Sequence, residues 1–196
     1  NVAIGQAAAL RDAAGKDRNK DNLGNFSNTV ALGTRTVVSA NNAVAIGSGA
    51  QATGESAISI GTGNVVSGAN SGALGDPSYI SGSGTYTMGN NNGTASAFIT
   101  AQNSGAFGNG NMMTGATNGS RIVGNNNNVT TDDTFVLGNG INTNNIANGA
   151  STGGTVANSV YLGSKSAATA GSAIGTANLK SDGTAGTTTT AGDKGT

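Results

Sequence analysis

Small and aliphatic residues alternate in short runs that end in glycine, and these runs recur along most of the chain. The clearest copies are TVALG at 29–33, AVAIG at 43–47 and AISIG at 57–61. Within each copy, successive side chains alternate between opposite sides of an extended backbone, which is the periodicity of a β-strand. The glycine that follows suits a tight turn, where the backbone can require a positive φ. Each copy therefore predicts one short strand closed by a turn.

The copies keep a regular spacing. The closing glycines from Gly33 to Gly89 are 14 residues apart, and the interval from Gly5 to Gly33 is two such periods. Between the copies lies a stretch of small, weakly apolar residues, such as SGAQATG at 48–54, which we call the softer half-unit. It predicts a second short strand and turn. A repeat of this length predicts a parallel β-solenoid with coils of about 14 residues, because one coil buries its aliphatic side only by stacking on others.

The repeat extends in weaker copies to Gly175, so residues 1–175 are predicted to form the solenoid and 176–196 to begin a different, non-repeating element. AFIT at 97–100 is interpreted as a further copy that has lost its glycine. The residues that define the repeat are paired aliphatic and glycine positions: Val44, Ile46, Gly47, Ile58, Ile60, Gly61, Leu74, Gly75, Leu137, Gly138, Leu162 and Gly163.

Both sides of the predicted strands carry few charges. We expect aliphatic side chains to fill the thin interior of each coil. The other side carries small residues, namely Ala31, Ala43, Ala45, Ala57 and Ser59. A broad, weakly apolar surface of this kind predicts burial against another chain. Identical copies arranged around an axis would cover it and would add the stability that a thin core lacks.

Three stretches interrupt the period, at about 6–28, 90–103 and 139–158. The first holds much of the chain's charge and is predicted to be a solvated loop or short helix, or else a recognition loop on a rigid scaffold. The other two are predicted to be loops on the solenoid surface. If exposed, Phe98 would be a contact anchor, although such a side chain more often fills a core. The candidate ligand-binding residues are therefore Arg11, Lys16, Arg18, Lys20 and Phe98.

The amino-acid composition argues against several functions. The chain has 34 glycines, one proline, 9% charged residues, and neither cysteine nor histidine. Low charge and scarce proline disfavour a disordered coil. Without cysteine and histidine there is no thiol nucleophile, no Ser-His-Asp triad and no histidine-based zinc site. The 9 basic and 9 acidic residues balance, so nucleic acid is not an expected partner.

The remaining chemical motifs are incomplete. Asp17, Asn19 and Asp21 have the spacing that begins an EF-hand loop, but Asn22 and Asn28 stand where glycine and glutamate are needed. Asp132 and Asp133 are adjacent, and on a strand they would point to opposite faces rather than act as an acid/base pair. Glycine-rich pieces such as Gly61-Thr62-Gly63 have no following helix or lysine to form a phosphate loop. We therefore expect no metal, no cofactor and no enzymatic activity.

The units NAVAIG at 42–47 and NSVYLG at 158–163 resemble the repeat of YadA-like heads in trimeric autotransporter adhesins of Gram-negative bacteria. The resemblance covers most of residues 1–175. It implies a left-handed parallel β-roll and a homotrimer on the bacterial surface, anchored in the outer membrane by a C-terminal barrel outside this sequence. It also implies attachment to host cells through a cell-surface receptor or an extracellular-matrix protein.

Two other functions fit a β-solenoid. A trimeric tailspike-like protein would bind or cleave polysaccharide, but cleavage requires paired carboxylates in one groove, and here carboxylates are few and scattered. An ice-binding solenoid would need regular ranks of threonine, whereas the outward positions predicted here vary from coil to coil.

Overall fold

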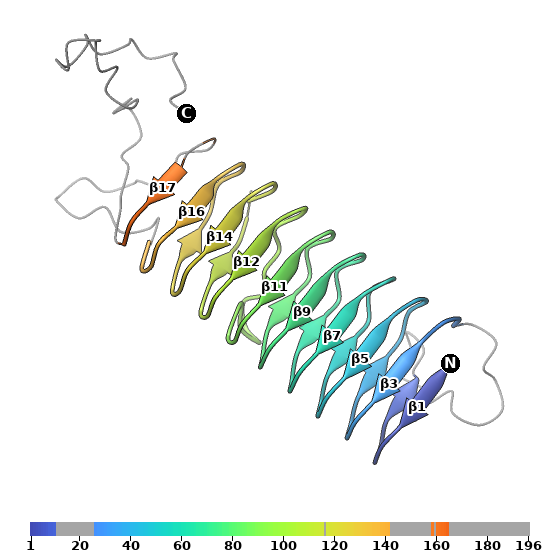
Figure 1. Cartoon of the computed structure of the whole chain (residues 1–196). Helices are drawn as coiled ribbons and strands as arrows, with labels where there is room; N and C mark the ends of the chain where they lie inside the picture. Colours follow the sequence, from blue (N-terminus) through green and yellow to red (C-terminus); the bar gives the residue numbers. More distant parts are fainter. Residues whose placement is uncertain (11–25, 116, 142–157, 159, 165–196) are drawn as a thin grey trace, which may run out of the picture.

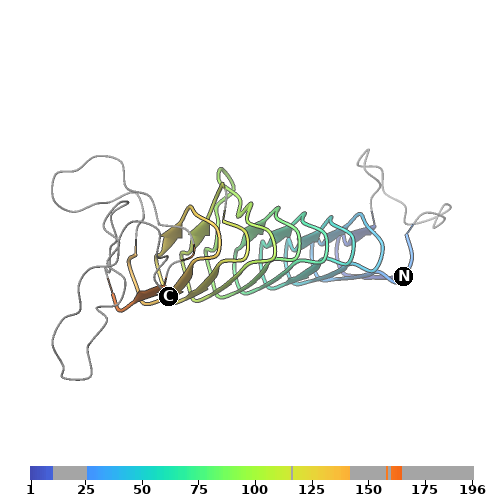
Figure 2. The ribbon, with the colours of Figure 1, turned by 90° about the horizontal axis from the view of Figure 1, so that it is seen from above.

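The computed structural model of the chain describes residues 1–10, 26–115, 117–141, 158 and 160–164. Over these residues the backbone winds into a parallel β-solenoid whose coils stack along one axis (Figure 1). Each coil contributes one strand to a long sheet and, in most coils, a shorter strand on the opposite side (Figure 2). The prediction of an all-β solenoid with coils of about 14 residues is confirmed, and the described part contains no helix.

Ten three-residue strands form the long sheet, which we call sheet A, and all of its pairs are parallel. Ten copies of the glycine-closed unit supply these strands, and the copy that ends at Gly175 lies outside the described residues. Along the axis the strands are β1 (Val2–Ile4), β3 (Val30–Leu32), β5 (Val44–Ile46), β7 (Ile58–Ile60), β9 (Gly72–Leu74), β11 (Tyr86–Met88), β12 (Gly105–Phe107), β14 (Arg121–Val123), β16 (Phe135–Leu137) and β17 (Val160–Leu162).

Two-residue strands line the opposite side of the coils, which we call the B side. They arise from the softer half-units, as the sequence predicts for Gln51–Ala52. Five of them pair in one sheet and two in another: β2 (Ala9–Leu10), β4 (Val37–Val38), β6 (Gln51–Ala52), β8 (Val65–Val66) and β10 (Tyr79–Ile80), then β13 (Met112–Met113) and β15 (Asn128–Val129).

All three predicted interruptions contain parts of the regular coil. In the stretch 139–158, Ile141 is buried in the core and its carbonyl oxygen accepts from the backbone N–H of Asn128 at 2.8 Å. Ala9–Leu10, inside the stretch 6–28, form β2 and pair with β4, while residues 11–25 lie outside the described part. In the stretch 90–103, Ile99 bridges Ile80 on the B side. The interpretation of AFIT as a degenerate sheet A strand is therefore wrong, because these residues occupy the softer half of their coil.

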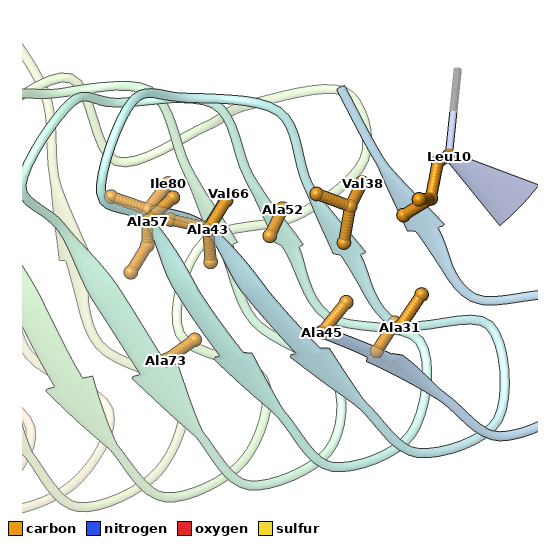
Figure 3. Close-up of a cluster of buried hydrophobic side chains, with 11 residues drawn as sticks. Leu10, Ala31, Val38, Ala43, Ala45, Ala52, Ala57, Val66, Ala73 and Ile80 are labelled. Atoms are coloured by element: carbon orange, nitrogen blue, oxygen red, sulfur yellow. The ribbon is translucent and has the colours of Figure 1, made fainter. Parts of the chain in front are cut away.

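The alanines that were expected to face another chain lie inside the coil, so this prediction is wrong. Ala31, Ala45 and Ala73 are fully buried in sheet A, and Figure 3 shows them facing Val38, Ala52 and Ile80 of the B side. The two sides are joined by turns of only a few residues, and the narrow interior accommodates only small side chains on sheet A. The larger aliphatic residues of sheet A therefore point outward.

A column of glycines closes the sheet A strands, and stacking requires this residue. Gly33 has φ +132°, and a Cβ at this position would lie 2.6 Å from the carbonyl oxygen of Gly47 in the next coil. Neither the backbone conformation nor the space allows a side chain. The glycine of each unit therefore sets both the turn and the close approach of successive coils.

Buried asparagines connect successive coils next to this column. Asn111 donates from Nδ2 to the carbonyl oxygen of Gly124 at 2.8 Å and to Oδ1 of Asn92 at 3.1 Å. Its own Oδ1 accepts from the backbone N–H of Asn127 at 3.2 Å and from that residue's Nδ2 at 3.1 Å. This ladder satisfies backbone groups that the turn would otherwise bury without partners.

Replacing Asn111 by alanine is expected to destabilise the fold by about 3 kcal/mol, because it leaves polar groups of two neighbouring coils buried and unpaired. Urea unfolding followed by circular dichroism at fixed protein concentration measures the change. Asn109→Ala is the matched control in the same coil, since Asn109 is exposed and its side-chain Oδ1 accepts from the backbone N–H of Asn90 at 2.7 Å. Equal stability of the two variants would contradict a structural role for the buried ladder.

Candidate functional site

The outward surface of sheet A, which we call the A face, is mostly apolar along its described length. Its side chains are the first and third residues of each strand, and Ile60 is 36% exposed whereas Leu162 is 63% exposed. Large exposed hydrophobic residues are contributed by nearly every strand: Val2, Ile4, Leu32, Ile60, Leu74, Tyr86, Met88, Phe107, Val123, Phe135, Leu137, Val160 and Leu162. A contiguous surface of this kind on a soluble protein marks a contact with another molecule.

The two columns of the A face differ. The third residue of each strand is large and apolar in all ten strands: Ile4, Leu32, Ile46, Ile60, Leu74, Met88, Phe107, Val123, Leu137 and Leu162. The first-position column is less regular, because it contains Gly72, Gly105 and Arg121. A Cβ at Gly72 would lie 2.8 Å from the ring of Tyr86, so this ring extends over the glycine of the neighbouring strand. The continuous ridge of the face is therefore its third-position column.

Arg121 is the charged residue of the A face within the described strands. Its Nη1 donates to the carbonyl oxygens of Asn103 at 2.5 Å and Ser120 at 2.9 Å, which turns the guanidinium toward the margin of the sheet. Its Cδ lies 3.5 Å from the position that a Cβ on Gly105 would take. The aliphatic stem thus covers the space left by the glycine, and the charge stays at the edge.

The outward row of the B side has a different character. Its residues are mostly half-buried, and no charged side chain stands in this row within the part of the chain that the structure describes. The row is Val37, Gln51, Val65, Tyr79, Phe98, Met112 and Asn128. Its centre is aromatic and its flanks, at Gln51 and Asn128, are polar.

Tyr79 and Phe98 form the aromatic centre. Their ring centroids are 5.5 Å apart, and the planes are inclined at 71° in an edge-to-face arrangement. Because Ile99 bridges Ile80, Phe98 takes the outward position beside Tyr79 in the neighbouring coil. We call these two residues the aromatic patch.

Extra residues between Asn92 and Phe98 form a small turn beside the aromatic patch. Thr94 donates its backbone N–H to the carbonyl oxygen of Ala97 at 2.8 Å, and Ala97 donates to that of Thr94 at 3.1 Å. The hydroxyl groups of Thr94 and Ser96 are 3.2 Å apart. Figure 2 shows this segment, in green, projecting from the B side of an otherwise smooth solenoid. The turn and the patch together are the most distinctive feature of this surface.

The structure places one of the predicted ligand-binding residues. Phe98 is half-buried on the B side, where its ring contacts Tyr79. Arg11, Lys16, Arg18 and Lys20 lie outside the described residues, so their role stays a prediction. Sequence reasoning missed Tyr79, although its position in the softer half of a coil, one coil before Phe98, was a usable signal.

The acidic residues do not assemble a reactive group. Asp132 and Asp133 lie on the turn before β16. Their placement on a strand, considered from the sequence, is therefore wrong. Asp132 accepts from the backbone N–H of Asn118 at 2.6 Å, and Asp133 has φ +49°. The described residues contain no group of three or more acidic side chains positioned to hold a metal ion. They also contain no helix of the length and apolar character needed to cross a membrane.

Comparison with known proteins yields no matching family model and no matching curated protein.

Proposed function

We propose that the chain is the head of a trimeric surface adhesin, in which three copies associate through the A face and present their B sides to a host cell. The observation that carries this proposal is the exposed apolar A face, which runs along the described solenoid from Val2 to Leu162. An isolated coil stack would leave this surface in water. Association of identical copies covers this surface and stabilises each thin core.

The number of copies follows from the resemblance of the repeat to trimeric autotransporter heads. The same resemblance supports a location on the bacterial surface, with the chain held in the outer membrane by a C-terminal barrel. The proposed partner is a host cell-surface receptor or an extracellular-matrix protein. Binding requires no catalysis, and three equivalent sites on one particle increase the overall affinity when each site is weak.

Cell attachment tests this function. Beads that carry the purified chain are expected to adhere to cultured epithelial cells, and an excess of the soluble chain is expected to compete. Beads coated with the chain after thermal denaturation are the control for non-specific sticking. Equal adhesion of native and denatured coatings would contradict an adhesive role of the folded head.

The tailspike alternative gains no specific support from the described surface, because Asp132 and Asp133 are adjacent on one turn rather than paired across a groove. Incubation with a panel of polysaccharides is expected to release no reducing ends. Release of reducing ends would favour the enzyme over the adhesin.

A further inference from the structure

We propose that the aromatic patch and the turn at 93–97 bind an uncharged glycan carried by the host receptor or matrix protein. The inference deepens the proposed function and rests on it, because the B side has to remain exposed when copies associate. It assigns a ligand class to a site formed by Tyr79, Phe98, Thr94 and Ser96.

The aromatic rings provide the apolar part of the site. The face of an aromatic ring carries partial negative charge and attracts weakly positive hydrogens, such as the C–H groups on one side of a sugar ring. Phe98 fixes the orientation of the Tyr79 ring by its edge-to-face contact at 5.5 Å. Both rings are half-buried, so each is held by the coil and still offers a surface to a ligand.

Uncharged polar groups stand on the turn that precedes Phe98. Thr94 and Ser96 are exposed on the projecting turn, and their hydroxyl groups can donate to or accept from sugar hydroxyls. Asn90 is exposed on the turn that leads to this segment, and its Oδ1 is used by the backbone of Asp76. No hydrogen bond of its Nδ2 is found in the described part, which leaves these two N–H groups available to a ligand.

The charge distribution favours a neutral ligand over an anionic one. The outward row of the B side carries no basic residue among the described residues, and Arg121 lies on sheet A. Asp76 is exposed on the turn before β10, where its Oδ1 accepts from the backbone N–H of Thr62, so the charge nearest to the patch along the chain is negative and disfavours a sialylated or sulfated sugar. Nucleic acid is disfavoured for the same reason, because its binding depends on neutralising phosphates.

The size of the site favours a small ligand. A stable protein–protein contact buries about 800 Å² on each partner, whereas the apolar part of the row that contains the aromatic patch runs only from Val65 to Met112, between Gln51 and Asn128. The reciprocal backbone hydrogen bonds of Thr94 and Ala97 hold the turn before any ligand arrives. A preformed site loses little conformational entropy on binding, which suits recognition of a few sugar rings.

A glycan panel probed with the full chain tests the inference. The panel contains neutral oligosaccharides, such as lactose- and N-acetyllactosamine-terminated chains, beside their sialylated and sulfated counterparts. We expect binding to members of the neutral set, and Phe98→Ala and Tyr79→Ala are each expected to lower the affinity at least roughly tenfold. Phe98→Tyr is expected to retain binding, since it keeps the ring.

Val37→Ala is the matched control, because Val37 has the same outward register on β4 and lies away from the aromatic patch. Light-scattering mass and bead adhesion are measured on the same samples. Absence of binding to the neutral set, preference for the anionic set, or equal binding by Phe98→Ala would each overturn the inference. If the mass and the adhesion are retained in such a case, the proposed function survives without it, whereas a monomeric mass would refute the trimer itself.

Discussion

Leu74→Lys combined with Leu137→Lys is expected to convert the assembly into single chains. Both leucines stand in the third-position column of the A face, with exposed fractions of 40% and 49%. In the proposed trimer, three copies of each lysine would be removed from water near one another without a partner charge. Burial of unpaired like charges costs several kcal/mol per group, which is more than an assembly of thin solenoids can absorb.

Sedimentation velocity at micromolar concentration measures this dissociation. Gln51→Lys combined with Asn128→Lys is the matched control, since it adds the same charge to the outward row of the B side. The control is expected to keep the mass of the native protein. If the control dissociated while the A-face variant kept the mass of the native protein, the contact between copies would lie on the B side, which would contradict the proposal.

Ala45→Leu is expected to destabilise the fold by about 3 kcal/mol. Ala45 is fully buried in β5, and the neighbouring strands place Ala31 and Ser59 beside it in register. The interior has no room for three additional carbon atoms, so the two sides of the coil would have to separate. Urea unfolding monitored by circular dichroism gives the change in free energy.

Ile46→Leu, one residue along the same strand, is the control. Ile46 is outward-facing and half-buried, so a change of branching there is expected to cost less than about 1 kcal/mol. A larger loss from Ile46→Leu than from Ala45→Leu would mean that the aliphatic column, and not the alanine column, fills the coil.

The sequence predicts the period of the coils correctly, but it does not predict which face of each strand is buried. Alternation shows that Ala45 and Ile46 face opposite sides, but it is symmetrical and does not say which side is buried. That choice depends on the space between the two sides of the coil, where Val38, Val66 and Ile80 already supply the bulk. These residues belong to the softer half-units. Their contribution to filling the interior becomes apparent only when the coil brings the B side opposite sheet A.

The candidate site shows the same limit. Phe98 could be singled out because an aromatic residue interrupts a repeat of small side chains. Its contact with Tyr79 depends on the extra residues at 93–97, which displace the chain and then return it to the register of Ile80 and Ile99. Spacing along the sequence alone places Phe98 in a degenerate strand, and only the hydrogen bonds of the turn place it beside Tyr79.

In the proposed trimer, copies of this chain cover one another's aliphatic column. Multi-angle light scattering of the purified chain at micromolar concentration measures whether they do. We expect a single species with three times the chain mass of 18.7 kDa. A soluble, folded species of 18.7 kDa would contradict it, because the A face would then be stable in water.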